Sequence, residues 1–255
     1  MLRLLLRSVV ATLLLGSAVA LRAQQTSFDD ARTLYSKEVT GGIVIHSDGW
    51  GLNFTHGKYV TAKSRRLLGI EVVSMKHPKE VKSFNPYYED SRGYFYGKIN
   101  YMVVLRPTYG RKHQISDKVR RSGVEVNWFW AIGPSIALVK PVYLQIGTTI
   151  VPYESIVVER YDPADPDHDV GMIYGRASWF RGLEESTFYP GGFGKVGLNF
   201  EYAGPSVSIK AIECGAAIDA YAQTIPIMAE VGDVKNKQFF ITLFASLQFG
   251  KKTVR

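Results

Sequence analysis

The chain has 255 residues with 31 Lys and Arg, 23 Asp and Glu, and a formal net charge of +8. Its basic residues are scattered along the sequence, whereas nucleic-acid binding requires a clustered basic surface. The single cysteine, Cys214, excludes an internal disulfide. We therefore expect no nucleic-acid partner and no disulfide framework.

Residues 1–23 have the pattern of an export signal. A basic start is followed by an apolar core over residues 9–15, which is shorter than the roughly 20 residues of a membrane-spanning helix. We favour cleavage after Ala23, with Ala20 as a second candidate, over the alternative of a single-pass anchor. No Cys follows the core, so a lipoprotein anchor is not expected. Cleavage after Ala23 removes three Arg and lowers the net charge from +8 to +5.

Segments of alternating apolar and polar residues follow in chain order. They cover residues 41–47, 50–55, 68–72, 95–105, 124–132, 195–202, 207–211 and 238–250. Alternation with a period of two predicts strands, and Asp48-Gly49 between the first two segments is a strong hairpin signal. The alternation slips near residues 211–212, which predicts a β-bulge. No segment reads as a long amphipathic helix, which argues against a βαβ enzyme fold.

The last long segment predicts how the sheet ends. Phe239, Ile241, Leu243 and Phe249 fall on one face of a C-terminal strand. A long alternating strand with an aromatic residue near the C-terminus is typical of the strand that closes a transmembrane β-barrel. We expect these four residues to lie at the barrel closure and to face lipid.

The alternation alone fits two folds. An exported β-sandwich would place apolar side chains inside and charges in water, whereas a small membrane barrel would do the reverse. The export signal and the C-terminal strand favour the membrane barrel over the β-sandwich. The sequence therefore predicts an all-β fold, an antiparallel transmembrane β-barrel of about eight strands, closed by the C-terminal strand and with a filled lumen. We expect an N-terminal periplasmic segment over residues 24–39, the barrel over 40–250, and a basic tail over 251–255.

Mid-strand charges on the polar faces are the first candidate functional residues. They are expected to form a lumenal charge network of Glu71, Lys98, Glu125, Lys195, Glu201, Lys210 and Glu213. Unpaired buried charges cost several kcal/mol, so these groups must pair and lock the lumen. Such a lumen argues against a diffusion channel.

An even number of strands places both termini on one side of the membrane, taken as periplasmic. The connections around residues 78–93, 141–191 and 222–237 then face outward with the hairpin at 48–49. Those around 57–64, 106–121 and 204–205 face the periplasm.

The long outward connection over residues 151–191 exceeds the usual length of an unstructured loop. Trp179 and Phe180 are its candidates for contact with the barrel mouth or with a partner. In the acidic stretch 161–169, the Asp residues have the spacing of the first ligands of a calcium-binding loop. The Glu that completes such a loop is missing from the pattern. We predict no metal site and no cofactor, and leave calcium binding by this stretch open.

A catalytic role is weighed at His46 and Ser47. Some small barrels modify lipids with a His, a Ser and an acid near the outer rim. Adjacent residues on a strand point to opposite faces, so His46 and Ser47 cannot cooperate directly, and Ser47 with Asp48 is better read as capping the turn. No catalytic residue is assigned.

The sequence resembles the small outer-membrane β-barrel proteins of Bacteroidota. The resemblance rests on residues 41–51, 75–82 and 189–193, on the pair 209–213 and 225–229, and on the terminal strand. It covers nearly all of the mature chain and implies an integral outer-membrane barrel in a Gram-negative cell envelope, with no catalytic residues to carry over.

The function predicted from the sequence is non-catalytic contact. The protein would be an accessory or interaction subunit of an envelope assembly or secretion complex, or an adhesin-like barrel, embedded in outer-membrane lipid. The alternative is a lipid-modifying enzyme similar to lipid A deacylases.

Overall fold

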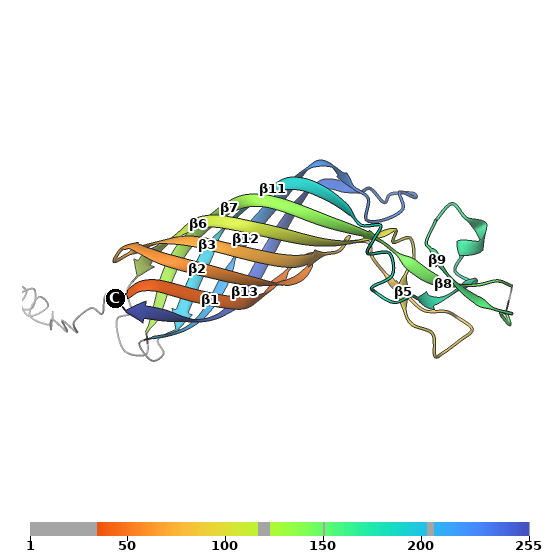
Figure 1. Ribbon diagram of the computed structural model, residues 1–255, viewed down its shortest axis with the longest axis horizontal. Helices are drawn as coiled ribbons and strands as arrows, with labels where there is room; N and C mark the ends of the chain where they lie inside the picture. The colour runs from red at the N-terminus through yellow and green to blue at the C-terminus, as the bar shows by residue number, and fades with distance from the viewer. Residues whose placement is uncertain (1–34, 117–122, 150, 203–206, 255) are drawn as a thin grey trace, which may run out of the picture. The chain divides into compact units, whose positions relative to one another are not determined.

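The computed structural model describes residues 35–116, 123–149, 151–202 and 207–254. Eight long antiparallel strands form a closed barrel in the order β1-β13-β12-β11-β7-β6-β3-β2 (Figure 1). The barrel strands are β1 (Tyr35–His46), β2 (Gly49–Thr61), β3 (Ser64–Met75), β6 (Asn100–Ser116), β7 (Val124–Pro141), β11 (Thr187–Tyr202), β12 (Ser208–Ile225) and β13 (Lys237–Val254). The predicted all-β barrel is confirmed. Among the described residues, no helix has the length and apolar character needed to cross a membrane.

The C-terminal strand closes the barrel. β13 pairs with β1 from Tyr35 opposite Val254 to His46 opposite Phe244. On its other side β13 pairs with β12, so neither edge of the sheet is left open. A closed sheet satisfies its own backbone hydrogen bonds, which is what a bilayer demands of a spanning structure.

The barrel strands extend beyond the limits expected from the sequence. β1 begins at Tyr35, within the segment expected to precede the barrel, and β13 continues through the expected tail to Val254. The eight barrel strands are 12 to 18 residues long, whereas a tilted strand needs only about 9–11 residues to cross a bilayer. The predicted export signal lies outside the described residues.

We call the end of the barrel with Tyr35 and Val254 the terminal end, and the opposite end the loop end. The connections at the loop end are 47–48, 76–99, 142–186 and 226–236. Their grouping matches the one expected from the sequence, although residues 57–61 belong to β2 and not to a turn.

The long connections at the loop end contain structure of their own. β8 (Tyr143–Gly147) lies between β10 (Ile173–Arg176) and β9 (Ile156–Arg160) in a three-stranded sheet. A short 3-10 helix, η1 (Pro166–His168), follows β9. β4 (Lys82–Ser83) pairs with β5 (Tyr94–Phe95). Figure 1 shows β5, β8 and β9 projecting beyond the barrel at the end away from the C-terminus.

β12 corrects one assignment of faces. Its register with β13 is continuous from Ser208 to Ala220, so the predicted bulge at 211–212 is absent. Ile209 and Ala211 are buried, and Lys210 is exposed on the exterior. Ile209 and Ala211 face the lumen although they are apolar, so the sequence pattern assigned this strand the wrong way round.

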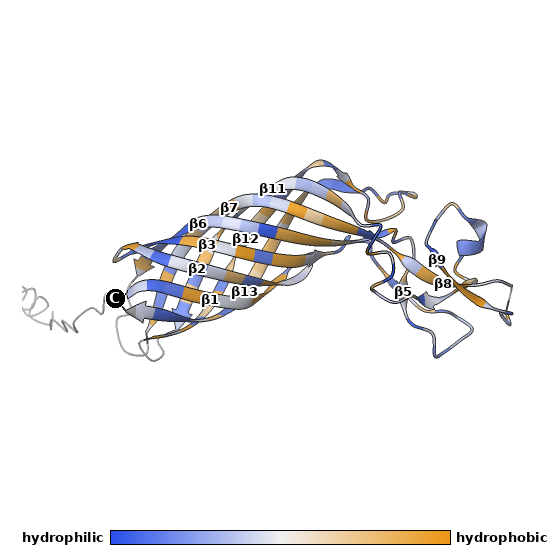
Figure 2. Ribbon diagram, viewed as in Figure 1, coloured by the Kyte–Doolittle hydropathy of each residue, from blue (hydrophilic) through white to orange (hydrophobic). Residues whose placement is uncertain are grey.

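Large apolar side chains cover the outside of the barrel. Exposed positions on β13 include Phe239, Ile241, Leu243, Leu247 and Phe249, and every other barrel strand also carries exposed large apolar residues. Figure 2 shows hydrophobic and hydrophilic residues alternating along the strands. Soluble proteins rarely expose continuous apolar surface of this extent, whereas contact with lipid requires it.

We predict that Leu243→Arg destabilises the barrel because Leu243 lies midway along the apolar exterior of β13 and is 70% exposed. A charge near the bilayer midplane should cost about 2–4 kcal/mol in the free energy of unfolding. The measurement is urea unfolding of the protein refolded into phospholipid vesicles. Lys251→Arg, on the same face of β13 at the terminal end, is the control and should have little effect. Equal losses in both variants would contradict lipid contact at Leu243.

Candidate functional site

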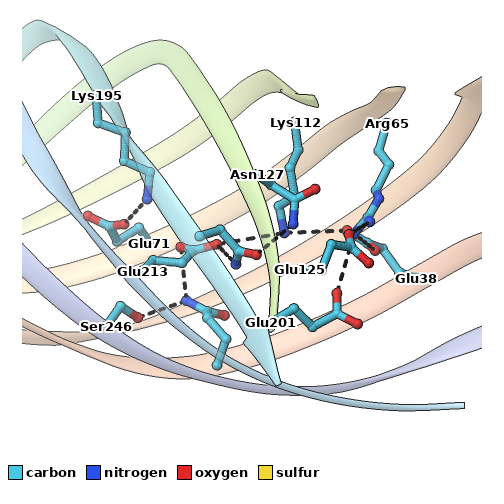
Figure 3. A network of polar contacts seen from close by, with 12 residues as sticks. Glu38, Arg65, Glu71, Lys112, Glu125, Asn127, Lys195, Glu201, Glu213 and Ser246 are labelled. Atoms are coloured by element: carbon cyan, nitrogen blue, oxygen red, sulfur yellow. Dashed lines mark hydrogen bonds and ion pairs between the residues drawn. The ribbon is translucent and has the colours of Figure 1, made fainter. Parts of the chain in front are cut away.

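The lumen near the terminal end holds a cross-barrel ion network centred on Arg65 (Figure 3). Arg65 Nη1 lies 2.8 Å from Glu38 Oε2 and 3.6 Å from Glu201 Oε2, and Nη2 pairs with Glu125. These carboxylates come from β1, β11 and β7, none of which is next to β3 in the barrel. Arg65 is only 3% exposed. Its five donors in a fixed fork suit several carboxylates at once.

Two lysines extend this terminal network to further strands. Lys252 Nζ on β13 lies 2.5 Å from Glu201 Oε1. Lys112 Nζ on β6 lies 3.6 Å from Glu38 Oε1 and 3.7 Å from Glu213 Oε1 on β12. Tyr59 on β2 donates its hydroxyl to Glu38 at 3.4 Å. Every strand of the barrel therefore contributes a side chain to the network.

A second network, centred on Arg106, lies farther along the lumen. Arg106 Nε and Nη2 donate to the two oxygens of Asp219 at 3.0 and 2.6 Å, and Nη1 donates to Glu71 at 2.6 Å. Lys195 Nζ donates to Glu71 at 2.8 Å. Ser135 donates to Asp219 at 2.7 Å. The bidentate bond from β6 to β12 crosses the lumen, because β7 and β11 lie between these strands in the ring.

Apolar side chains fill the space around the two networks. Phe129, Phe193 and Phe244 form a buried cluster with Val44 and Ala217. The Arg106 guanidinium lies 4.6 Å from the centre of the Phe193 ring, a cation–π distance. Charge and aromatic packing therefore leave the lumen filled.

A hydrophobic cap seals the lumen at the loop end. Its members come from β3, β6, β7, β12 and β13 and from the connection after β12: Val73, Met75, Met102, Val104, Ala137, Val139, Tyr221, Ile225, Ile227, Met228 and Phe240. The carbonyl oxygen of Ile227 accepts hydrogen bonds from the backbone N–H groups of Ile99 and Asn100, both at 3.1 Å. The connection is thereby bonded into the barrel mouth.

Lys98 belongs beside this cap and not in the expected mid-strand network. It precedes β6, forms an isolated bridge with Met228, and donates from Nζ to Glu80 at 2.7 Å. Burial lowers the pKa of the Lys98 ammonium, and the Glu80 carboxylate opposes that shift. Lys98 and the outward-facing Lys210 are thus the two expected lumenal residues that were placed wrongly.

The remaining five expected lumenal residues lie inside the barrel. Glu125 and Glu201 contact Arg65, Glu213 lies near Lys112, and Glu71 pairs with Lys195. Glu213 also accepts a hydrogen bond from Asn199 at 3.0 Å.

Six lumenal charged residues were missed by the sequence prediction: Glu38, Arg65, Arg106, Lys112, Asp219 and Lys252. Glu38, Arg106, Lys112 and Lys252 lie in parts of the chain that were assigned to a loop or a terminal segment. Arg65 and Asp219 lie between a predicted strand and the neighbouring connection. The period-two alternation continues through these positions. Extending each predicted strand along this alternation, beyond the minimum length that crosses a bilayer, would have placed these charged residues in the lumen.

A folded subdomain covers the loop end. Its core contains Tyr94, Val142, Leu144, Ile146, Tyr161 and Ile173. Burial raises the pKa of Tyr94 to about 12. Trp179 and Phe180 lie outside this core and are 51% and 73% exposed, with their rings edge to face at 5.5 Å. They remain contact candidates.

The acidic stretch 161–169 uses its carboxylates to cap backbone turns. Asp165 Oδ1 accepts from Asp167 N at 3.0 Å, and Asp162 Oδ1 accepts from Ala164 N at 2.9 Å. Within the described ranges, no group of three or more acidic, His or Cys residues is arranged to hold a metal ion.

His46 and Ser47 diverge as expected from their places on a strand end. His46 is buried, and its Nδ1 accepts from Asp48 N at 3.3 Å, whereas Ser47 is exposed. The two side chains do not form a nucleophile–base pair.

No protein-family model and no curated protein sequence matches the chain. Among solved structures, Neisserial surface protein A (NspA) is similar at 9% identity and a TM-score of 0.38, over 86% of this chain and 96% of that chain. The attachment invasion locus protein Ail of Yersinia pestis, solved with the heparin analogue sucrose octasulfate, is similar at 8% identity and a TM-score of 0.39, over 86% and 100%. These values are too low to support an argument about function.

We predict that Arg65→Met lowers the free energy of unfolding by about 3–5 kcal/mol, because it leaves buried carboxylates without their shared cation. Arg66→Met is the matched control: Arg66 is the next residue on β3 but is exposed, and its loss should change stability by no more than about 0.5 kcal/mol. Urea unfolding in detergent micelles measures both. A loss at Arg65 as small as that at Arg66 would show that the network does not stabilise the barrel.

Proposed function

We propose that the protein is an integral outer-membrane β-barrel of a Gram-negative cell envelope and that it acts by non-catalytic contact. The apolar exterior and the polar, charged interior support insertion in a bilayer, and the predicted export signal supports the outer membrane. The loop end would then face outward and the terminal end the periplasm.

The filled lumen is the observation that carries this proposal. Arg65, Arg106 and their carboxylate partners span the interior, and the hydrophobic cap lies beyond them. Transport by diffusion would require an open, water-filled lumen. The surface of the barrel, and above all its loop end, is therefore where the protein would act.

The loop-end subdomain is built for contact. The core around Leu144 and Ile173 holds it as a folded unit, while Trp179 and Phe180 expose large apolar surface. Aromatic residues of this kind are enriched where protein partners bind. We assign the protein to an envelope assembly or secretion complex, as an accessory subunit that docks a partner at this subdomain.

A lipid-modifying enzyme is the rival function. His46 and Ser47 would have to cooperate, and their side chains lie on opposite sides of the strand. The rival predicts that lipid A from a deletion strain differs in acyl content by mass spectrometry. Our proposal predicts no difference.

We predict that Trp179→Ser with Phe180→Ser abolishes recovery of the partner in a detergent pull-down from native membranes. Val81→Ser is the control, because Val81 is equally exposed at 70% but lies in another connection of the loop end. Both variants should accumulate as folded barrels, checked by the mobility shift on boiling. Partner recovery that is unchanged by the double substitution, or lost equally in the control, would contradict docking at Trp179 and Phe180.

A further inference from the structure

A small basic pocket lies where the loop-end subdomain meets the outer end of β7. It has a volume of about 200 Å³. Its lining includes three cationic and three aromatic side chains: Arg92, Lys140, Arg176, Tyr101, Tyr143 and Trp179. These residues come from four separate parts of the chain that the fold brings together.

The cations of the pocket have no carboxylate of their own. Among the described residues, no carboxylate oxygen lies within 4.0 Å of the charged groups of Arg92, Lys140 or Arg176. The nearby Glu185 is engaged elsewhere, since it accepts from the Tyr143 hydroxyl and lies 3.5 Å from Arg160. Glu184 and Glu185 act on Lys140 only from beyond 4.0 Å, so among the described residues the three cations of the pocket have no direct ion pair.

Lys140 is a buried cation, since its side chain is only 3% exposed. Its Nζ donates to the carbonyl oxygens of Pro141 and Arg181 at 3.0 and 2.8 Å, which fixes the ammonium without neutralising it. A buried charge is normally paired, so a bound anion would supply what the chain does not. Arg176 N donates to the backbone oxygen of Arg92 at 3.2 Å, so the two arginines belong to backbone segments that lie next to each other. Two guanidinium groups offer paired donors to a phosphate, sulfate or carboxylate.

The aromatic rings narrow the ligand class. The Lys140 ammonium lies 5.4 Å from the Tyr101 ring centre and 5.9 Å from that of Trp179. Rings with a polar edge present an apolar face together with hydrogen-bonding groups, which suits a sugar ring with its C–H face and hydroxyls. Drug-sized ligands occupy about 300–1,000 Å³, so this smaller pocket fits one sugar unit or less.

We infer that this pocket binds a single sugar unit that carries one acidic group. The acidic group contacts Lys140, Arg92 and Arg176, and the ring of the sugar lies against the aromatic side chains. This site is separate from the apolar contact surface proposed for a protein partner, although Trp179 borders both.

The test is a titration of the full chain, refolded in detergent, followed by tryptophan fluorescence at constant ionic strength. The probes are glucose 1-phosphate, glucose 6-sulfate and glucuronate, with glucose and inorganic phosphate as controls. Trp179 lines the pocket, so binding should change the emission saturably, and Trp179→Phe should remove the change. At least one acidic sugar should bind, and more tightly than either control.

Substitutions of the pocket arginines test whether the sugar binds in this pocket. Arg92→Gln and Arg176→Gln should each weaken binding by roughly tenfold or more, since each removes charged hydrogen bonds. Arg111→Gln is the control, because Arg111 is exposed on β6 toward the terminal end, away from the pocket, and should leave binding unchanged. Inorganic phosphate that binds as tightly as the acidic sugars would overturn the sugar assignment. Binding by none of the three acidic sugars, or equal loss in Arg111→Gln, would overturn the site.

Discussion

The pairing of charges across a closed, narrow lumen is the constraint on which the rest of this structure depends. Among the described residues, Arg65 and Arg106 each bridge strands that are not neighbours in the sheet. An eight-stranded barrel has room inside only for side chains, so every charge placed there must meet a partner. Backbone hydrogen bonds between neighbouring strands close the sheet. The ion networks connect strands that face each other across the lumen.

This constraint also determines where function can reside. Salt bridges, aromatic rings and the hydrophobic cap occupy the lumen over the described residues, which argues against a diffusion channel. The apolar exterior is suited to lipid. The loop end is different, because it carries a folded subdomain with its own core. It also combines exposed Trp179 and Phe180 with a pocket whose cations form no direct ion pair with any described residue. We therefore propose that contact and recognition are concentrated at the loop end.

Much of the fold could be predicted from the sequence because period-two alternation is a local signal. It located all eight strands, and the terminal strand from Phe239 to Phe249 indicated closure. The lumenal network was only partly predictable, since partners such as Arg106 and Asp219 are 113 residues apart and only the strand order brings them together. Lys210 was misplaced because the apolar residues Ile209 and Ala211, on the inside of β12, imitate a lipid-facing pattern. The basic pocket could not have been predicted, because Arg92, Lys140 and Arg176 meet only through the folding of long connections.

The most direct test of cross-lumen pairing is a double-mutant cycle between Arg106 and Asp219. The cycle compares the free energies of unfolding of Arg106→Met, Asp219→Leu and the double variant in detergent micelles. The account predicts that each single change is strongly destabilising and that the double variant is more stable than the sum of the two losses implies. The expected coupling is about 1–3 kcal/mol. Additive losses, with coupling below about 0.5 kcal/mol, would contradict the account, because the two charges would then contribute independently and not as a pair across the lumen.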